Sequence, residues 1–177
     1  READAICQVV RAFEDGDVVH VDGKVDPAGD IETINTELIL ADLQTLEKAL
    51  PRLEKEARIQ KDRAAVVDAA VQAKEILDSG RTLFSAGIDP EPLRELFLLT
   101  NKPFLYVINC DEEELGDEGF RAEMTALVAP AEAVFLDAQV EAELSELPED
   151  EALDLLQSIG QEESGIQALA RVGFETL

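Results

Sequence analysis

The most regular pattern in the chain is a pair of apolar seams between residues 39 and 77. Within each seam the apolar positions are separated by three or four residues, which keeps one side of a helix facing a single partner helix. We predict that Asp30 caps a long helix and that the two seams form a projecting antiparallel hairpin. Two ordinary helices packed in a core are the alternative. The seams consist of Ile39, Leu43, Leu46, Leu50, Leu53 and Ala57, and of Val66, Ala70, Ala73 and Leu77.

The rest of the chain alternates short apolar runs with amphipathic stretches. Strand–helix–strand order with short connections is typical of a parallel sheet with right-handed crossovers. We therefore predict an α/β fold in which residues 30–89, the hairpin, are inserted into a sheet domain formed by 1–29 and 90–177. The predicted strands are 3–13, 103–108 and 133–136, with a short extended piece at 18–25. The predicted helices are 92–100, 117–128, 140–147, 149–159 and 164–173.

Composition narrows the class of protein. The 177 residues include 40 acidic and 15 basic side chains, and a net charge of −25 argues against a surface built as a whole to grip nucleic acid. Hydrophobic residues make up 46% of the chain and fall in periodic runs, which argues against disorder. No apolar run approaches the roughly 18 residues that a membrane span needs. Two distant cysteines in apolar segments indicate a reducing compartment, so we expect a cytoplasmic protein without a membrane partner.

Candidate chemistry lies where the predicted strands end. Asn109 directly follows a buried strand and Glu112 comes three residues later, and ligands of open parallel sheets bind at the carboxyl ends of strands. An amide that donates and accepts, beside a carboxylate that accepts, can read a purine edge. The loop 137–139 after the next strand could present a backbone N–H to the same base. The alternative is that these carboxylates merely suit helix N-termini.

A basic stretch interrupts the acidic chain at the predicted hairpin tip. Residues 48–63 hold six cations against three carboxylates, a net charge of +3. Helical spacing places Lys48, Arg52 and Lys55 on one face. We expect contact with RNA or an acidic protein surface, the alternative being a solvated helix flank. The six cations are Lys48, Arg52, Lys55, Arg58, Lys61 and Arg63. His20 has no His or Cys cluster beside it in sequence, so no metal site is expected.

Two segments resemble the YchF family of Obg-like ATPases, which are P-loop NTPases related to translation-factor GTPases. The segments are 22–27 (DGKVDP) and 30–43 (DIETINTELILADL), and the resemblance continues through 102–107, 135–138 and 141–144. It implies the C-terminal half of a G domain with a coiled-coil insertion. In the family a TGS domain follows, so we expect this chain to be the central part of a longer protein.

The resemblance also implies roles for particular residues. The family's base-reading Asn-x-x-Glu, associated with a shift from GTP towards ATP, falls on Asn109 and Glu112, with Cys110 as a backbone contact. Its Ser-Ala-Lys-like loop falls on Asp137, Ala138 and Gln139, of which the first and third depart from that pattern.

The parts of the family's site that act on phosphates are not found here. The sequence contains no Gly-x-x-x-x-Gly-Lys-Ser/Thr, the loop that cradles phosphates. The complete protein is expected to bind and hydrolyse ATP or GTP with Mg²⁺ and to associate with ribosomes. The segment alone is expected neither to hold nucleotide tightly nor to hydrolyse it. It has no predicted catalytic residue. The competing hypothesis is a non-enzymatic helical-hairpin adaptor.

Overall fold

The computed structural model describes residues 3–13 and 25–176, with Asp62 described by its backbone only. The described residues pack as two units. Residues 3–6 and 31–103 form the hairpin unit, and residues 7–13, 25–30 and 104–176 form the sheet unit. The predicted extended piece at 18–25 lies almost wholly outside the described residues. Among the described residues, no helix combines the length and apolar character that crossing a bilayer requires.

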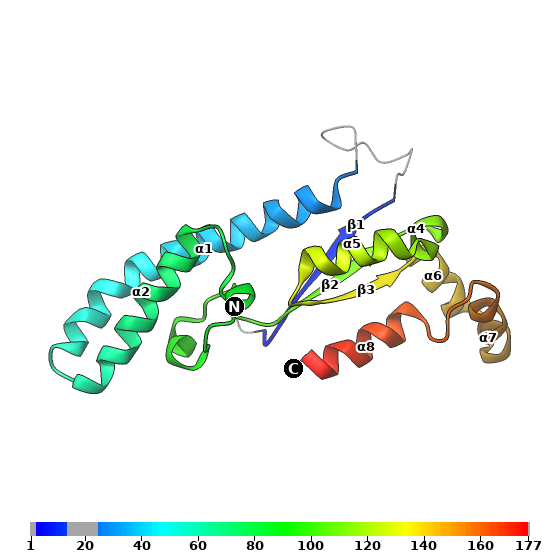
Figure 1. The fold of residues 1–177 in the computed structure, drawn as a ribbon. Helices are drawn as coiled ribbons and strands as arrows, with labels where there is room; N and C mark the ends of the chain where they lie inside the picture. Colours follow the sequence, from blue (N-terminus) through cyan, green and yellow to red (C-terminus); the bar gives the residue numbers. More distant parts are fainter. Residues whose placement is uncertain (1–2, 14–24, 177) are drawn as a thin grey trace. The chain divides into compact units, whose positions relative to one another are not determined.

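The hairpin consists of α1 (Pro27–Ala57) and α2 (Ala64–Asp78), joined through the short 3₁₀ helix η1 (Lys61–Arg63). The two helices run antiparallel side by side (Figure 1). α1 starts three residues before the predicted cap, because the Asp26 carboxylate accepts from Gly29 N at 3.0 Å and the Asp26 carbonyl accepts from Asp30 N at 3.0 Å. Asp30 therefore lies in the first helical turn, and Pro51 lies inside α1 without ending it.

The seam residues form the core of the hairpin unit together with a segment that follows them. Leu46, Leu53 and Ala70 are fully buried, while Leu43 and Leu50 are partly buried against them. Leucines from the short helix α3 (Leu83–Ala86) and the 3₁₀ helix η2 (Glu91–Leu96) complete this core. Residues 90–103, which the sequence analysis placed with the sheet, pack on the hairpin here. The predicted helix 92–100 was wrong in type and length, because the segment forms the 3₁₀ helix η2, which ends at Leu96. Phe97 follows in the left-handed region, with φ 49°.

A buried carboxylate ties α1 to the chain that leads into the sheet. Asp42 has no exposed surface, and its Oδ1 accepts from Leu99 N at 2.8 Å. Its Oδ2 accepts from Thr100 N at 2.7 Å and from the Thr100 hydroxyl at 2.8 Å. Three hydrogen bonds replace the hydration that burial removes from the carboxylate.

The sheet contains three strands in the order β1 (Ile6–Arg11), β2 (Phe104–Asn109) and β3 (Glu132–Leu136). β2 and β3 are parallel. β1 advances in the same direction, since Ile6 N donates to Pro103 O and Ala12 N donates to Asn109 O. The predicted α/β fold with a parallel sheet and an inserted helical hairpin is therefore confirmed.

Helices cover both faces of the sheet unit. α5 (Glu118–Val128) lies on one face and α8 (Gly165–Thr176) on the other (Figure 1). This explains why five successive residues of β2, Phe104 to Ile108, are all buried. α4 (Glu112–Gly116), α6 (Ala138–Glu146) and α7 (Glu149–Ser158) connect these elements. The predicted helices after residue 116 are confirmed within a few residues.

Removing the Asp42 carboxylate should destabilise the hairpin unit. Asp42→Ala leaves two amides and a hydroxyl unsatisfied, so we expect the free energy of unfolding in urea to fall by about 3 kcal/mol. Asp42→Asn retains one acceptor and should lose less. Asp68→Ala removes an exposed carboxylate from α2 and serves as the control, with an expected change within about 0.5 kcal/mol. Equal stability of the Asp42→Ala and Asp68→Ala variants would contradict the stabilising role of the Asp42 hydrogen bonds.

Candidate functional site

Asn109 and the loop 137–139 meet at the carboxyl ends of two neighbouring strands. Asn109 ends β2 and is paired in register with Leu136, the last residue of β3. The side-chain oxygen of Asn109 accepts a hydrogen bond from the backbone N of Ala138 at 3.0 Å. The side-chain NH₂ of Asn109 has no partner among the described residues, so it is the group with which this side chain can donate to a ligand.

The Asp137 side chain binds the backbone of its own loop. Its Oδ1 accepts from Gln139 N at 2.8 Å and from Val140 N at 3.3 Å, which makes it the N-cap of α6. Serine, which the resemblance implies at this position, is also a favoured N-cap, so aspartate would keep the local role. Gln139 is exposed and its backbone N–H is taken by this cap.

Cys110 is held by the sheet. Its backbone N donates to Leu136 O at 2.9 Å, and its thiol lies 3.3 Å from Ile108 O. The residue is 1% exposed. Burial, reinforced by the nearby carboxylates of Glu114 and Asp111, raises the pKa of the Cys110 thiol to about 12. Of the backbone groups through which Cys110 could contact a base, the N–H is therefore already engaged within the sheet.

Glu112 stands apart from the capping interactions around it. Asp111 caps α4 by accepting from Glu114 N at 3.0 Å, and Glu114 accepts in return from Asp111 N at 3.2 Å. This capping box, an Asp-x-x-Glu pattern visible in the sequence, was missed by the sequence analysis. Glu112 is exposed at the first position of α4, and its carboxylate has no partner among the described residues. The helix-start role thus belongs to Asp111 and Glu114, which leaves Glu112 able to accept from a ligand.

Together these groups have a defined hydrogen-bonding character. The NH₂ of Asn109 can donate, the carboxylate of Glu112 can accept, and the N–H of Ala138 is occupied. Adenine presents an acceptor at N7 and a donor at its 6-amino group, whereas guanine presents acceptors at both N7 and O6. The Asn109 NH₂ can thus donate to N7 of either purine, and the Glu112 carboxylate can accept from the 6-amino group of adenine or from the ring N–H and 2-amino group of guanine.

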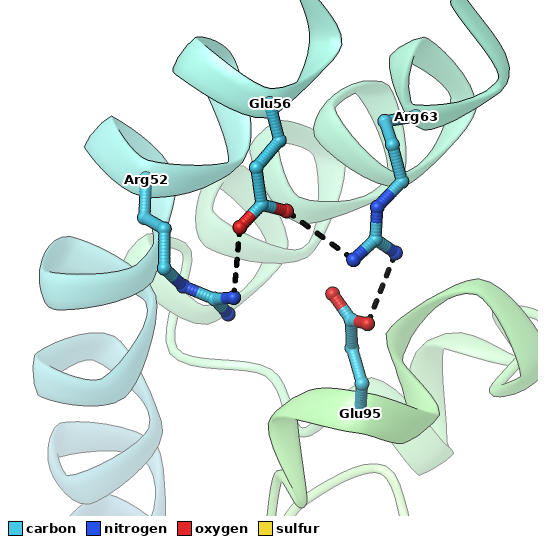
Figure 2. A network of polar contacts seen from close by, with 4 residues as sticks. All are labelled: Arg52, Glu56, Arg63 and Glu95. Atoms are coloured by element: carbon cyan, nitrogen blue, oxygen red, sulfur yellow. Dashed lines mark hydrogen bonds and ion pairs between the residues drawn. The ribbon is translucent and has the colours of Figure 1, made fainter. Parts of the chain in front are cut away.

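The six cations of the hairpin tip divide into two classes. Figure 2 shows a network in which Arg52 pairs with Glu56 at 3.0 Å, and Arg63 pairs with Glu56 at 3.2 Å and with Glu95 at 3.0 Å. This network joins α1, η1 and η2 within the hairpin unit. The other four cations are exposed and form no ion pair with the side chains that the structure describes. They are Lys48, Lys55, Arg58 and Lys61.

An open groove of about 420 Å³ runs along this part of α1. Lys48, Arg52 and Lys55 line it together with Pro51, Glu56 and Ile59, and Ile59 is 85% exposed. We call the four unpaired cations and this groove the hairpin basic surface. Among the described residues, no group of three His, Cys, Asp or Glu side chains could hold a metal ion.

The chain is similar over its whole length to proteins of one family. No protein-family model matches the chain. The chain is 40% identical over 187 aligned positions to the ribosome-binding ATPase YchF of Bacillus subtilis, covering 100% of the chain and 51% of that protein. It is 37% identical over 123 positions to Obg-like ATPase 1 of Saccharomyces cerevisiae, covering 64% of the chain and 31% of that protein.

A solved structure agrees with these relatives. The structure of the Schizosaccharomyces pombe YchF GTPase matches with a TM-score of 0.81 at 26% identity, covering 98% of the chain and 50% of that structure. The chain thus spans about half the length of the bacterial YchF relatives that it matches.

The two thiols should differ in reactivity. The thiolate is the reactive form, and Cys110 is buried with a pKa near 12, whereas Cys7 is exposed. At about pH 8 a disulfide-exchange reagent should label Cys7 in the folded chain and Cys110 only after unfolding in urea. Raising the pH to about 10 should speed the labelling of Cys7 and leave Cys110 protected, because that pH stays below the pKa of Cys110. Rapid labelling of Cys110 in the folded Cys7→Ser variant would contradict this assignment.

Proposed function

Because the chain belongs over its whole length to the family of YchF and Obg-like ATPases, we propose that it carries the base-recognition part of an ATP site. The observation that carries this proposal is the hydrogen bond from Ala138 N to Asn109 Oδ1. It holds the amide of Asn109 with its NH₂ available to donate, and it occupies the N–H that guanine O6 would need. Asn109 would donate to N7 of adenine and Glu112 would accept from its 6-amino group. GTP would be the weaker ligand.

In this proposal, another segment of the complete protein binds the phosphates and Mg²⁺. The sequence has no P-loop motif, and phosphoryl transfer depends on positioning and electrostatics around phosphates and metal. The chain by itself is therefore expected to lack hydrolysis and tight nucleotide binding. In domain terms, residues 1–29 and 90–177 would belong to the G domain along the chain, with residues 90–103 packed on the hairpin, and residues 30–89 to its coiled-coil insertion.

We further propose that the hairpin basic surface mediates association with the ribosome, through RNA or an acidic protein surface. The bacterial relatives are named ribosome-binding ATPases. In a chain of net charge −25, four exposed cations without ion partners among the described side chains offer a surface for a polyanion. A ribosome-associated protein would work in the cytoplasm. An adaptor that uses only the hairpin would share this surface but would bind no nucleotide.

The base site is tested by calorimetry of the complete gene product with ATP and GTP. Asn109→Ala should weaken ATP binding about tenfold, because one hydrogen bond to the base is lost and the loop loses its partner. Glu112→Gln should reduce the preference for ATP over GTP. Gln157→Ala, an exposed amide on α7, is the control and should bind as the parent does. If Asn109→Ala binds both nucleotides as the parent does, the base-recognition proposal fails.

The hairpin surface is tested by co-sedimentation of the complete gene product with ribosomes at low salt. Reversing three charges with Lys55→Glu, Arg58→Glu and Lys61→Glu should reduce the bound fraction several-fold, and the parent's binding should weaken as salt rises. Arg94→Glu reverses one exposed cation outside the hairpin basic surface and is the control for the single variant Lys55→Glu. Arg94→Glu should leave the bound fraction as in the parent. Unchanged sedimentation of the triple variant would exclude this surface as the contact.

A further inference from the structure

A carboxylate on α6 holds the first turn of the last helix, α8. Glu141 lies one turn after Ala138 in α6. Its Oε1 accepts from Gly165 N at 2.6 Å, and its Oε2 accepts from Ile166 N at 3.2 Å. Both oxygens of one side chain thus bind the first two amides of a helix 24 residues away in sequence. A carboxylate at a helix N-terminus also interacts favourably with the helix dipole.

The remaining amides of this helical turn are satisfied locally. Ser164 Oγ accepts from Gln167 N at 3.1 Å, and Gln167 Oε1 accepts from Ser164 N at 3.0 Å. Ala168 N donates to Ser164 O at 2.9 Å. Every backbone amide in the first turn of α8 therefore has a partner within the chain. Glu141 accounts for two of these partners and so links α6 to α8.

Gly165 allows α8 to approach the end of β3. A β-carbon at this position would lie 2.3 Å from Leu136 Cβ and 3.0 Å from Glu141 Oε1. Leu136 Cβ is fixed to the backbone and cannot rotate away, so a side chain at residue 165 would force the helix or the strand to move. Gly173, in the same helix, has no heavy atom within 4 Å of such a β-carbon.

The contacts of Glu141 and Gly165 converge on the residues that build the base site. Leu136 immediately precedes the loop 137–139, pairs in register with Asn109, and accepts from Cys110 N at 2.9 Å. Glu141 N donates to Asp137 O at 3.0 Å, at the start of the same loop. A shift of α8 away from β3 would therefore be transmitted to Leu136 and to the first turn of α6.

We propose that Glu141 and Gly165 are positioning residues of the base site. They seat α8 against β3 and α6, so that Ala138 N stays within hydrogen-bond distance of Asn109. Neither residue touches the base. This inference rests on the proposed function of Asn109, and it adds that purine selectivity depends on the docking of α8.

The experiment uses the complete gene product with two pairs of matched variants. Gly165→Ala is compared with Gly173→Ala in the same helix, and Glu141→Ala with Glu143→Ala, an exposed carboxylate of α6. Calorimetry measures binding of ATP, GTP and inorganic tripolyphosphate, which lacks a base. Amide hydrogen exchange at Ala138 reports directly on the bond to Asn109. Glu141→Gln keeps a side-chain acceptor and provides a milder variant if Gly165→Ala fails to fold.

We expect Gly165→Ala and Glu141→Ala to weaken ATP binding about tenfold and to narrow the ATP-to-GTP ratio. Tripolyphosphate binding should change less than about twofold, and exchange at Ala138 should accelerate. The control variants should match the parent, and Glu141→Gln should lie between the parent and Glu141→Ala.

Two results would overturn the positioning role while leaving the base site intact. One is parental ATP affinity and parental exchange at Ala138 in folded Gly165→Ala and Glu141→Ala. The other is an equal loss of ATP and tripolyphosphate binding, which indicates general destabilisation. In both cases Asn109→Ala would still weaken ATP binding. If Asn109→Ala has no effect, the proposed function fails and the positioning role fails with it.

Discussion

The in-register parallel pairing of β2 with β3 is the constraint on which the candidate site depends. Because Asn109 and Leu136 end their strands at the same level, the loop after β3 starts beside the last side chain of β2. The N–H of Ala138 is then close enough to bind the Asn109 amide. A slip of the register would separate these two groups, since each step along a strand moves a residue by about 3.3 Å.

Some of the many carboxylates in this chain stabilise helix N-termini. Several carboxylates accept backbone amides at helix starts, as Asp26, Asp111, Asp117 and Asp137 do, and Glu141 does so for a second helix. Each such contact satisfies amides that a helix leaves unpaired at its N-terminus. The carboxylates behind the net charge of −25 are therefore not all solvated surface groups, because some of them cap helices. The four unpaired cations of the hairpin basic surface contrast with this acidic background.

Some elements could be predicted because their signals are local. The steps of three and four residues along α1 and α2 predicted the hairpin, and the continuous apolar run from Phe104 predicted a strand covered on both faces. The 3₁₀ helix η2 could not be predicted in the same way. Leu93 and Leu96 take positions that fit the core of the hairpin, and this packing overrides the helical preference of the segment.

The sequence by itself determined the α/β class and the inserted hairpin, and it marked the strand-end residues Asn109 and Glu112 and the loop 137–139 as candidates for a base site. These follow from periodicity, strand ends and motif spacing, which are properties of neighbouring residues. Only the tertiary structure decided which donors are already engaged, which cations are paired, and why residue 165 is a glycine. Those features depend on contacts between residues distant in sequence, such as Glu141 with Gly165 and Arg63 with Glu95. Only the fold brings such residues together.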